Sequence, residues 1–193
     1  MNRAADVAVA GTLLLATSPL LALGALAVKL GGGPALYRQT RVGKDGVDFE
    51  LLKLRTMVVG AETQGAGFAV DRGDTRITRA GRILRRLSID ELPQLWNVVR
   101  GDMSVIGPRP TLRYQVDLYT DRQRRRIDVK PGITGWAQVH GRAELPWDRR
   151  IELDIWYVEH RTALLDLQIL LRTPLALFGG TYKGETGGWK THS

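Results

Sequence analysis

Two acidic residues stand side by side at Asp90-Glu91, within the most arginine-rich part of the chain. Neighbouring residues of a helix point about 100° apart, so the two carboxylates need not share one partner. One carboxylate can attack an electrophile such as phosphorus while the other holds a metal ion. The alternative interpretation is structural, because acidic side chains in a first helical turn are stabilised by the helix dipole.

A second set of candidate residues is basic and suited to phosphate. Arg109 lies between Pro108 and Pro110, whose rings restrict the backbone around it. Such a rigid arginine suits a fixed anionic target, although a plain rigid turn with a solvated side chain would have the same sequence. Lys53 and Arg55 alternate along a predicted strand and so share one face, where they either contact phosphate or form a solvated strand end.

The composition removes several other kinds of chemistry. The 193-residue chain contains no cysteine, which excludes disulfides, thiolate nucleophiles and cysteine-ligated metals. Its three histidines form no HExxH zinc motif, and the chain has neither a P-loop nor a dinucleotide-binding glycine pattern. The length corresponds to one domain with some additional chain.

The net charge is concentrated in one quarter of the chain. From Arg76 to Arg126 there are 12 arginines against 5 acidic residues, a net charge of +7 out of +8 for the whole chain. A field of this sign attracts phosphate on a nucleotide, an anionic lipid or a nucleic acid. It should also keep the Asp90 carboxylate ionised at pH 7.

An apolar segment precedes this basic region. Residues 7–28 contain no charged side chain, which is long enough for a helix to cross a bilayer. Three interpretations compete: a spanning helix, a signal peptide cleaved after Ala25-Leu26-Ala27, and a re-entrant hairpin broken at Ser18-Pro19. The apolar stretch is longer than in most signal peptides. The residues alone do not separate the other two interpretations, because basic side chains flank both ends.

The elements that must position these residues follow from periodicity and turn signals. The pattern predicts strands at 35–42 and 47–57, a loop at 60–74, and extended pieces at 103–106 and 133–139. It predicts helices at 76–87, 88–100 and 111–128, and further helices in 144–178 that Pro174 breaks or kinks. Ser88 and Glu91 have the spacing of a capping box. The 76–87 helix is amphipathic, with arginines on its polar face, which is typical of helices at a membrane surface or of a solvated face.

Taken in order, these pieces resemble the monotopic polyprenol-phosphate phosphoglycosyltransferases, also called bacterial sugar transferases. The likeness runs from residue 1 to about residue 180 and corresponds to the minimal catalytic unit of the family. The matching pieces are the apolar start with Ser18-Pro19, Lys53-Leu-Arg55-Thr-Met57, Arg76-Ile-Thr-Arg-Ala-Gly81, Ser88-Ile-Asp-Glu-Leu-Pro-Gln-Leu-Trp-Asn97, Gly101-Asp-Met-Ser-Val-Ile-Gly-Pro-Arg-Pro110 and Lys130-Pro-Gly-Ile-Thr-Gly-Trp-Ala-Gln138.

The resemblance implies a reaction. A sugar 1-phosphate passes from a UDP-sugar to polyprenyl (undecaprenyl) phosphate, releasing UMP, in the first membrane step of glycoconjugate or exopolysaccharide synthesis. By resemblance, Asp90 attacks the β-phosphate and forms a covalent phosphosugar-enzyme, and Glu91 binds an essential Mg²⁺. Lys53, Arg55 and Arg109 are expected to bind phosphate, and Asp154 to join the site.

The resemblance also implies an architecture. The expected fold is α+β: a re-entrant helix-break-helix at 1–30, a compact and mostly helical catalytic domain at 31–178 with a small antiparallel β-hairpin and interfacial amphipathic helices, and a flexible tail at 179–193. The re-entrant segment, broken at Ser18 and Pro19, places the enzyme on the cytoplasmic face of the bacterial inner membrane. The expected partners are a UDP-sugar, polyprenyl phosphate and the bilayer, without nucleic acid.

Some features depart from the family pattern or leave alternatives open. His140 stands where asparagine is expected, and the Gly31–Gly33 run is unusual. A membrane-anchored basic module that binds anionic lipid or nucleic acid would explain the charge, but not Asp90-Glu91 or Arg109. A lipid-diphosphate phosphatase would use the same carboxylate. The sequence does not name the sugar, the glycan pathway or the oligomeric state, a homodimer included.

Overall fold

The computed structural model describes residues 2–64, 73–141 and 145–179, and the side chains as far as residue 176. The fold is α+β and largely helical, as predicted. The helices are α1 (Arg3–Leu30), η1 (Lys44–Gly46), η2 (Ala61–Thr63), α2 (Arg79–Arg86), η3 (Ile89–Glu91), α3 (Gln94–Arg100), α4 (Arg113–Asp117), α5 (Asp121–Arg124), η4 (Arg125–Ile127), α6 (Trp136–Val139), α7 (Trp147–His160) and α8 (Ala163–Gly179). The strands are β1 (Leu36–Val42), β2 (Asp48–Leu54), β3 (Ser104–Ile106) and β4 (Gly132–Thr134).

Helix α1 is continuous over 28 residues, so the predicted interruption at Ser18-Pro19 is wrong. Pro19 has no N–H and cannot donate to the carbonyl of Leu15 one turn earlier. The hydroxyl of Ser18 donates to that carbonyl instead, with an O···O distance of 2.8 Å. A neighbouring side chain therefore satisfies the acceptor that proline leaves free, which allows a helix to run through proline.

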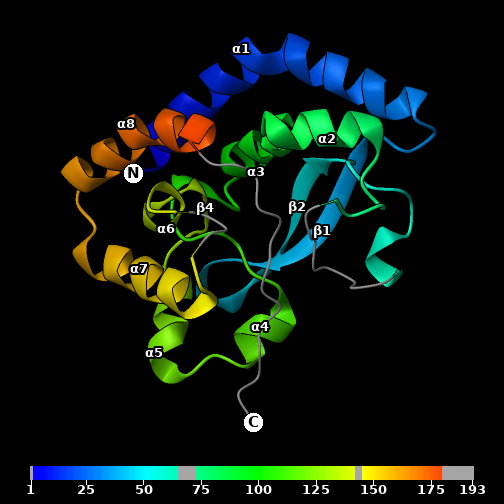
Figure 1. The fold of residues 1–193 in the computed structure, drawn as a ribbon. Helices are drawn as coiled ribbons and strands as arrows, with labels where there is room; N and C mark the ends of the chain where they lie inside the picture. Colours follow the sequence, from blue (N-terminus) through cyan, green and yellow to red (C-terminus); the bar gives the residue numbers. More distant parts are fainter. Residues whose placement is uncertain (1, 65–72, 142–144, 180–193) are drawn as a thin grey trace.

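Both ends of α1 pack against the rest of the molecule, and the helix arches over α3 and α2 (Figure 1). Near its start, the buried carboxylate of Asp6 accepts hydrogen bonds from the Ser104 hydroxyl at 2.8 Å and the Val105 N–H at 2.9 Å. Near its end, Gly24 lies so close to Leu54 that an added Cβ would come within 2.8 Å of a Leu54 methyl carbon. The helix thus lies along the body instead of projecting from it.

The Gly31–Gly33 run ends α1 and begins the approach to β1. Gly31 caps the helix, and its N–H donates to the carbonyl of Val28. Gly32 adopts φ +86°, a left-handed conformation that favours glycine. A Cβ on Gly33 would lie 3.3 Å from Cδ of Arg55. The run therefore gives a tight turn and a close approach to a basic side chain.

The predicted β-hairpin is present. β1 and β2 pair antiparallel, with Leu36 opposite Leu54 and Val42 opposite Asp48. The connection at 44–46 includes two residues with positive φ, Asp45 and Gly46, as a tight turn requires. β2 ends at Leu54, three residues before the predicted end at Met57.

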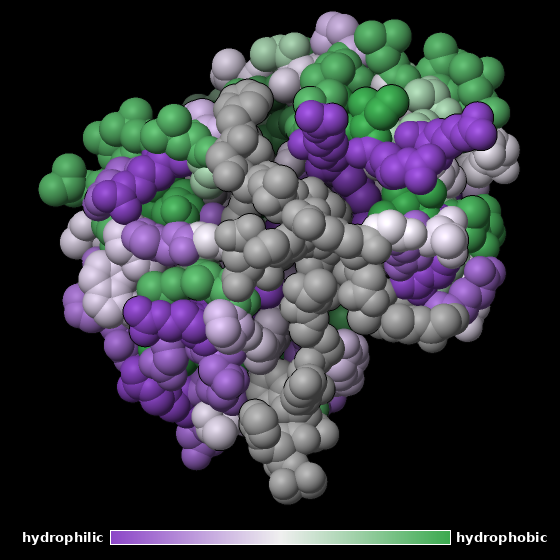
Figure 2. Space-filling view, in the orientation of Figure 1, coloured by the Kyte–Doolittle hydropathy of each residue, from purple (hydrophilic) through white to green (hydrophobic). Residues whose placement is uncertain are grey.

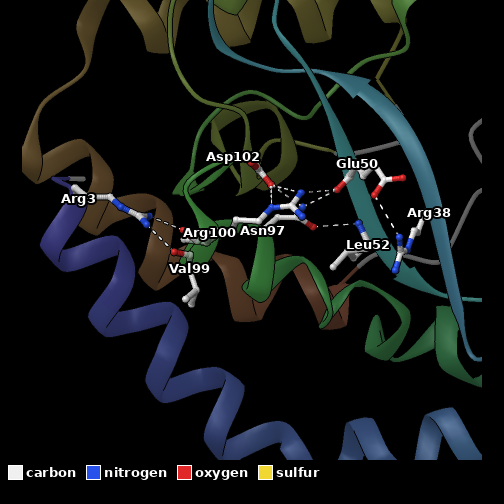
Figure 3. A network of polar contacts seen from close by, with 9 residues as sticks. Arg3, Arg38, Glu50, Leu52, Asn97, Val99, Arg100 and Asp102 are labelled. Atoms are coloured by element: carbon white, nitrogen blue, oxygen red, sulfur yellow. Dashed lines mark hydrogen bonds and ion pairs between the residues drawn. The ribbon is translucent and has the colours of Figure 1, made fainter.

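A buried asparagine fastens the hairpin to α3 (Figure 3). The side-chain amide of Asn97 donates to the carbonyl of Glu50 at 2.7 Å, and its oxygen accepts from the N–H of Leu52 at 3.0 Å. It also donates to Asp102 at 3.1 Å, and Asp102 is paired with Arg100. Because Asn97 is fully buried, these bonds fix β2 against α3 without competition from water.

The second pair of strands is parallel and depends on glycine. β3 and β4 pair in register, Ser104 with Gly132 and Ile106 with Thr134. A Cβ on Gly132 would lie 2.1 Å from the backbone nitrogen of Gly107, so only glycine fits this crossing. The chain turns helical at Trp136, and the predicted extended piece at 133–139 is wrong beyond β4.

The remaining helices are shorter or longer than predicted. The single helix expected at 111–128 is divided into α4, α5 and η4, because Thr120 begins a new helix with a capping box to Gln123. α8 runs on through Pro174 without a break. The predicted loop at 60–74 contains η2, and its residues 65–72 lie outside the described residues. The predicted tail lies outside them from residue 180 onward.

Apolar side chains gather on one side of the molecule (Figure 2). Figure 2 shows them along the upper edge, over α1, and at the upper left over α8, whereas hydrophilic side chains lie over α2 and dominate the lower left. The large exposed apolar residues on these three helices are Val7, Leu13, Leu15, Leu20, Leu23, Leu26, Leu30, Ile83, Leu87, Leu164, Leu167, Leu171 and Leu175. Exposed apolar side chains in such numbers indicate an interaction with a membrane or another protein.

Candidate active site

A strained turn delivers Asp90 to the site. α2 ends at Arg86 and is capped by Leu87, and Ser88 then adopts φ +55°, a left-handed conformation that is uncommon for a residue other than glycine. The side chain of Ser88 makes no capping bond, so the predicted capping box is wrong. The predicted helix 88–100 is instead η3 followed by α3, with Pro93 at the start of α3. Such strain costs about 1–3 kcal/mol and occurs preferentially at functional sites.

Asp90 is buried, with 7% of its surface exposed. Its pKa is raised to about 6, mainly by burial and then by the negative charge of Glu91, while the positive charges of Lys53, Arg85 and Arg109 lower it. The arginines were expected to dominate, and burial outweighs them. At pH 7 the carboxylate is still roughly nine-tenths ionised, because the pH lies about one unit above the pKa.

Glu91 holds two of the predicted phosphate-binding residues. Its Oε1 atom lies 2.6 Å from Nη2 of Arg109 and 3.5 Å from Nζ of Lys53. The second carboxylate oxygen lies 3.4 Å from the other terminal nitrogen of Arg109, so the arginine grips both oxygens. The structure thus brings together four residues from three separate parts of the sequence: Lys53 on β2, Asp90 and Glu91 on η3, and Arg109 after β3.

The other two predicted residues contact different partners. Arg55 follows β2, and its guanidinium carbon is 5.2 Å from the centre of the Tyr37 ring. The Nε of Arg55 is buried and has no hydrogen-bond partner among the described residues. Asp154 on α7 is 1% exposed and pairs with Arg126, its Oδ2 lying 2.7 Å from Nε. Burial raises the pKa of Asp154 against the opposing charge of Arg126.

Arg85 is a further side chain at the site, and the sequence did not single it out. Arg85 faces inward from α2, bonds the hydroxyl of Thr56 at 2.7 Å and lowers the pKa of Asp90. Gln94 and Gln138 are buried, and amide atoms of both lack hydrogen-bond partners. Because buried amides are nearly always satisfied, a water molecule or a ligand is expected to complete the hydrogen bonding at these two positions. Both glutamines lie in motifs that carry the family resemblance.

The residues fit a magnesium ion only with the help of a substrate. Within residues 2–64, 73–141 and 145–179, no group of three histidine, aspartate or glutamate side chains is arranged to hold a metal. Mg²⁺ in phosphate-transfer sites is usually held by one or two carboxylates together with substrate phosphates and water. Asp90 and Glu91 supply that number of carboxylates.

The described site is a buried carboxylate with Lys53, Arg85 and Arg109 around it, on a body that carries a helix apolar enough to cross a membrane. The chain belongs to the bacterial sugar transferase family, whose sequence model matches residues 1–180. The match confirms the resemblance inferred from the motifs and identifies the protein as a phosphoglycosyltransferase enzyme.

Individual relatives agree with this assignment. The uncharacterized sugar transferase EpsL of Bacillus subtilis is 45% identical over 174 residues, which cover 90% of this chain and 85% of EpsL. A UDP-glucose:undecaprenyl-phosphate glucose-1-phosphate transferase of Caulobacter vibrioides is 48% identical, covering 89% of this chain and 67% of that protein. A protein of the same name from Escherichia coli is 40% identical, and the match covers only 39% of its length.

Proposed function

We propose that this protein transfers a sugar 1-phosphate from a UDP-sugar to polyprenyl phosphate and releases UMP. The main observation behind the proposal is that Asp90 is buried beside Glu91, and that Glu91 forms ion pairs with Arg109 and Lys53. The names of the relatives support the two substrate classes, since those proteins act on UDP-glucose and undecaprenyl phosphate.

In the first half-reaction, a carboxylate oxygen of Asp90 attacks the β-phosphorus of the UDP-sugar. The bond from that phosphorus to the oxygen that bridges it to the uridine phosphate breaks, and UMP leaves with the electron pair. Arg109 and Lys53 pair with Glu91 in the structure. When the UDP-sugar binds, they can pair with its diphosphate instead and stabilise the negative charge that builds up on the diphosphate oxygens. The product on the enzyme is a phosphosugar ester of Asp90.

In the second half-reaction, a phosphate oxygen of polyprenyl phosphate attacks the same phosphorus. The bond to Asp90 breaks, which restores the carboxylate and yields polyprenyl-diphosphate sugar. Asp90 suits both roles, because a carboxylate with a raised pKa is a better nucleophile than an ordinary one and still a good leaving group. The same side chain thus serves each half-reaction without an additional base.

Asp90 and Glu91 are the residues we propose to hold Mg²⁺, with the substrate diphosphate completing the ligands. The bound ion would neutralise diphosphate charge as the leaving group departs. When Glu91 binds the ion, Arg109 and Lys53 would be available to pair with phosphate oxygens. The pairing of Glu91 with two cations keeps them at the site before substrate arrives.

We propose further that α1 enters the bilayer from the cytoplasmic face and does not cross it. The helix is apolar enough to span a membrane. A straight helix of 28 residues would carry its ends about 42 Å apart along the bilayer normal. Asp6 and Gly24, near opposite ends of the helix, both contact the catalytic body, which favours the two ends lying on one side. This is the re-entrant topology, formed by an arched helix instead of a broken one.

The function is tested by presenting the full chain in nanodiscs with Mg²⁺, a panel of UDP-sugars and polyprenyl phosphate. The expected result is UMP together with a sugar-linked polyprenyl diphosphate from one UDP-sugar or a few. A phosphatase would instead release inorganic phosphate from a lipid diphosphate without an acceptor lipid. Absence of a sugar-linked lipid with every donor of the panel would overturn the proposal.

A further inference from the structure

A buried arginine lies directly behind the active-site Arg109. Arg126, on η4, is 4% exposed, and each of its three nitrogens donates a hydrogen bond. Nε donates to Asp154 at 2.7 Å, Nη1 to the hydroxyl of Tyr119 at 2.6 Å, and Nη2 to the backbone carbonyl of Arg109 at 3.0 Å. The Trp147 ring covers the guanidinium, with 5.5 Å between the guanidinium carbon and the ring centre. One charged group therefore joins α7, the end of α4 and the backbone of the catalytic site.

The backbone that carries Arg109 is held at four consecutive carbonyls by donors from other elements. The acceptor and donor pairs are Pro108 with the N–H of Gly132 at 2.8 Å, Arg109 with Arg126 at 3.0 Å, Pro110 with Arg41 at 3.2 Å, and Thr111 with the N–H of Val42 at 2.9 Å. Because Pro108 and Pro110 donate nothing themselves, the segment depends on these incoming bonds for its place. Of the two side-chain donors, that of Arg126 is the buried one.

A buried charge in this position is not explained by stability alone. Taking an arginine and an aspartate out of water offsets much of their mutual attraction, and apolar replacements are often as stable. What the pair provides is direction, since the planar guanidinium fixes its three acceptors in one plane. The acceptor on the catalytic side is the backbone carbonyl of Arg109 itself. Holding this peptide group in place sets the direction in which the Arg109 side chain points.

We infer that Arg126 is a positioning residue that aims the Arg109 guanidinium at Glu91 and the substrate diphosphate. Asp154 and Tyr119 hold Arg126 in turn. On this account Asp154 acts on catalysis through Arg126 and Arg109. It does not touch substrate, because only 1% of its surface is exposed. The inference rests on the proposed function, because it assigns Arg126 through the proposed role of Arg109.

The test is a double-mutant cycle with the full chain in one detergent. Arg126→Gln is made in the wild-type chain and in Arg109→Ala, and kcat and KM for UMP release are measured separately. We expect Arg126→Gln to lower kcat/KM by about tenfold or more in wild type, but by less than about twofold when Arg109 is already absent. We also expect Arg126→Gln and Arg109→Ala to change the same parameter, kcat or KM.

A purely structural role predicts equal losses in both backgrounds, and that result would overturn the inference. If Arg126→Gln does not fold, Tyr119→Phe replaces it in the cycle, because it removes one acceptor and keeps the Arg126–Asp154 pair. Arg122→Gln is the matched control, since Arg122 on α5 pairs with Glu152 on α7 at the surface, 3.0 Å apart, and should leave kcat/KM unchanged. A wild-type chain that releases no UMP would instead count against the proposed function itself.

Discussion

Asp90 and Glu91 are neighbours in sequence and occupy different environments. Asp90 is buried and forms no close ion pair with any residue that the structure describes, whereas Glu91 pairs with Arg109 and Lys53. Two carboxylates whose surroundings drive their properties apart are suited to two different roles. Here the buried carboxylate is the proposed nucleophile, and the paired one organises charge around the diphosphate.

The raised pKa of Asp90 predicts an acid limit to activity. The nucleophile must be ionised, so the rate of UMP release should fall as pH drops through about 6. Glu91 raises that pKa by its negative charge, so Glu91→Gln should move the acid limb of the profile to lower pH even as it lowers the maximal rate. The measurement is single-turnover UMP release between pH 5 and 8. An acid limb unchanged by Glu91→Gln would contradict the coupling.

The same shift predicts a stability effect with a definite sign. A carboxyl whose pKa is raised on folding stabilises the fold while it is protonated, and that contribution is lost as pH rises from about 4 through 6. Asp90→Asn removes the buried charge, so it should raise the free energy of unfolding at pH 8 by up to about 3 kcal/mol, and by little at pH 4. Thermal unfolding at the two pH values measures this. Equal shifts at both pH values would contradict it.

The sequence selected the four residues that the structure brings together, but not the side chains that support them. Asp90, Glu91, Lys53 and Arg109 could be selected because their residue types suit phosphate chemistry and they lie in the family motifs, although each pattern alone also has a structural interpretation. Arg85 could not, because its inward direction depends on how α2 packs beside Thr56. The contacts of Asp154 could not be foreseen either, since its partner Arg126 lies 28 residues away.

At the scale of elements, one buried side chain sets the distance between β2 and α3. Asn97→Ala would leave the carbonyl of Glu50 and the N–H of Leu52 without their partner, and should destabilise the fold by about 2–4 kcal/mol. It should also lower activity, because Lys53 lies next along β2. Arg38→Gln is the control: its ion pair with Glu50 is exposed, so the loss should be below about 1 kcal/mol. Chemical denaturation compares the two, and equal losses would contradict the assignment.

The arched α1 predicts where its ends lie. Cysteines placed at Ala4 and Pro34, both exposed, should react alike with a membrane-impermeant thiol reagent in this cysteine-free chain. In intact cells both should be protected, and in inverted vesicles both should be labelled. Pro19→Ala restores a backbone donor to Leu15 and should favour a straight, spanning helix. Labelling of one end alone from outside, in the chain that keeps Pro19, would contradict the re-entrant topology.

Local patterns predicted elements correctly only where tertiary contacts agreed with them. Thr120 and Gln123 form a capping box that divides the predicted 111–128 helix. Ser88 and Glu91 have the same spacing and form none, because Glu91 is taken by Arg109 and the backbone of Ser88 is left-handed. Likewise, the Ser18 hydroxyl keeps α1 helical where proline predicts a break. Each exception depends on a single side-chain contact, which no periodicity contains.

For the whole molecule, the apolar surface over α1, α2 and α8 predicts a bilayer contact. Leu171 on α8 is 69% exposed, and Leu171→Glu should weaken binding to anionic lipid vesicles several-fold while leaving soluble-detergent turnover near wild type. The matched control is Leu118→Glu, since Leu118 is 49% exposed and follows α4, away from this surface. Vesicle flotation gives the bound fraction. Equal losses for both variants would contradict the placement of the bilayer.

The arrangement of the whole molecule follows from contacts that charge and hydropathy do not specify. The sequence indicated one apolar segment, a basic region and an α+β domain. It did not indicate that Asp6 would be buried against Ser104, so that the apolar helix α1 and the strand leading to Arg109 share one polar contact. That contact makes α1 part of the catalytic body.

The account depends most on the covalent role of Asp90, and one measurement addresses it directly. The enzyme is mixed with Mg²⁺ and its UDP-sugar in the absence of lipid acceptor, and intact-protein mass is recorded together with UMP. Wild type should gain the mass of one sugar phosphate, peptide mapping should place it on Asp90, and Asp90→Asn should gain none. An adduct on the Asp90→Asn protein would contradict the account, as would a wild-type enzyme that turns over with lipid and never carries the added mass.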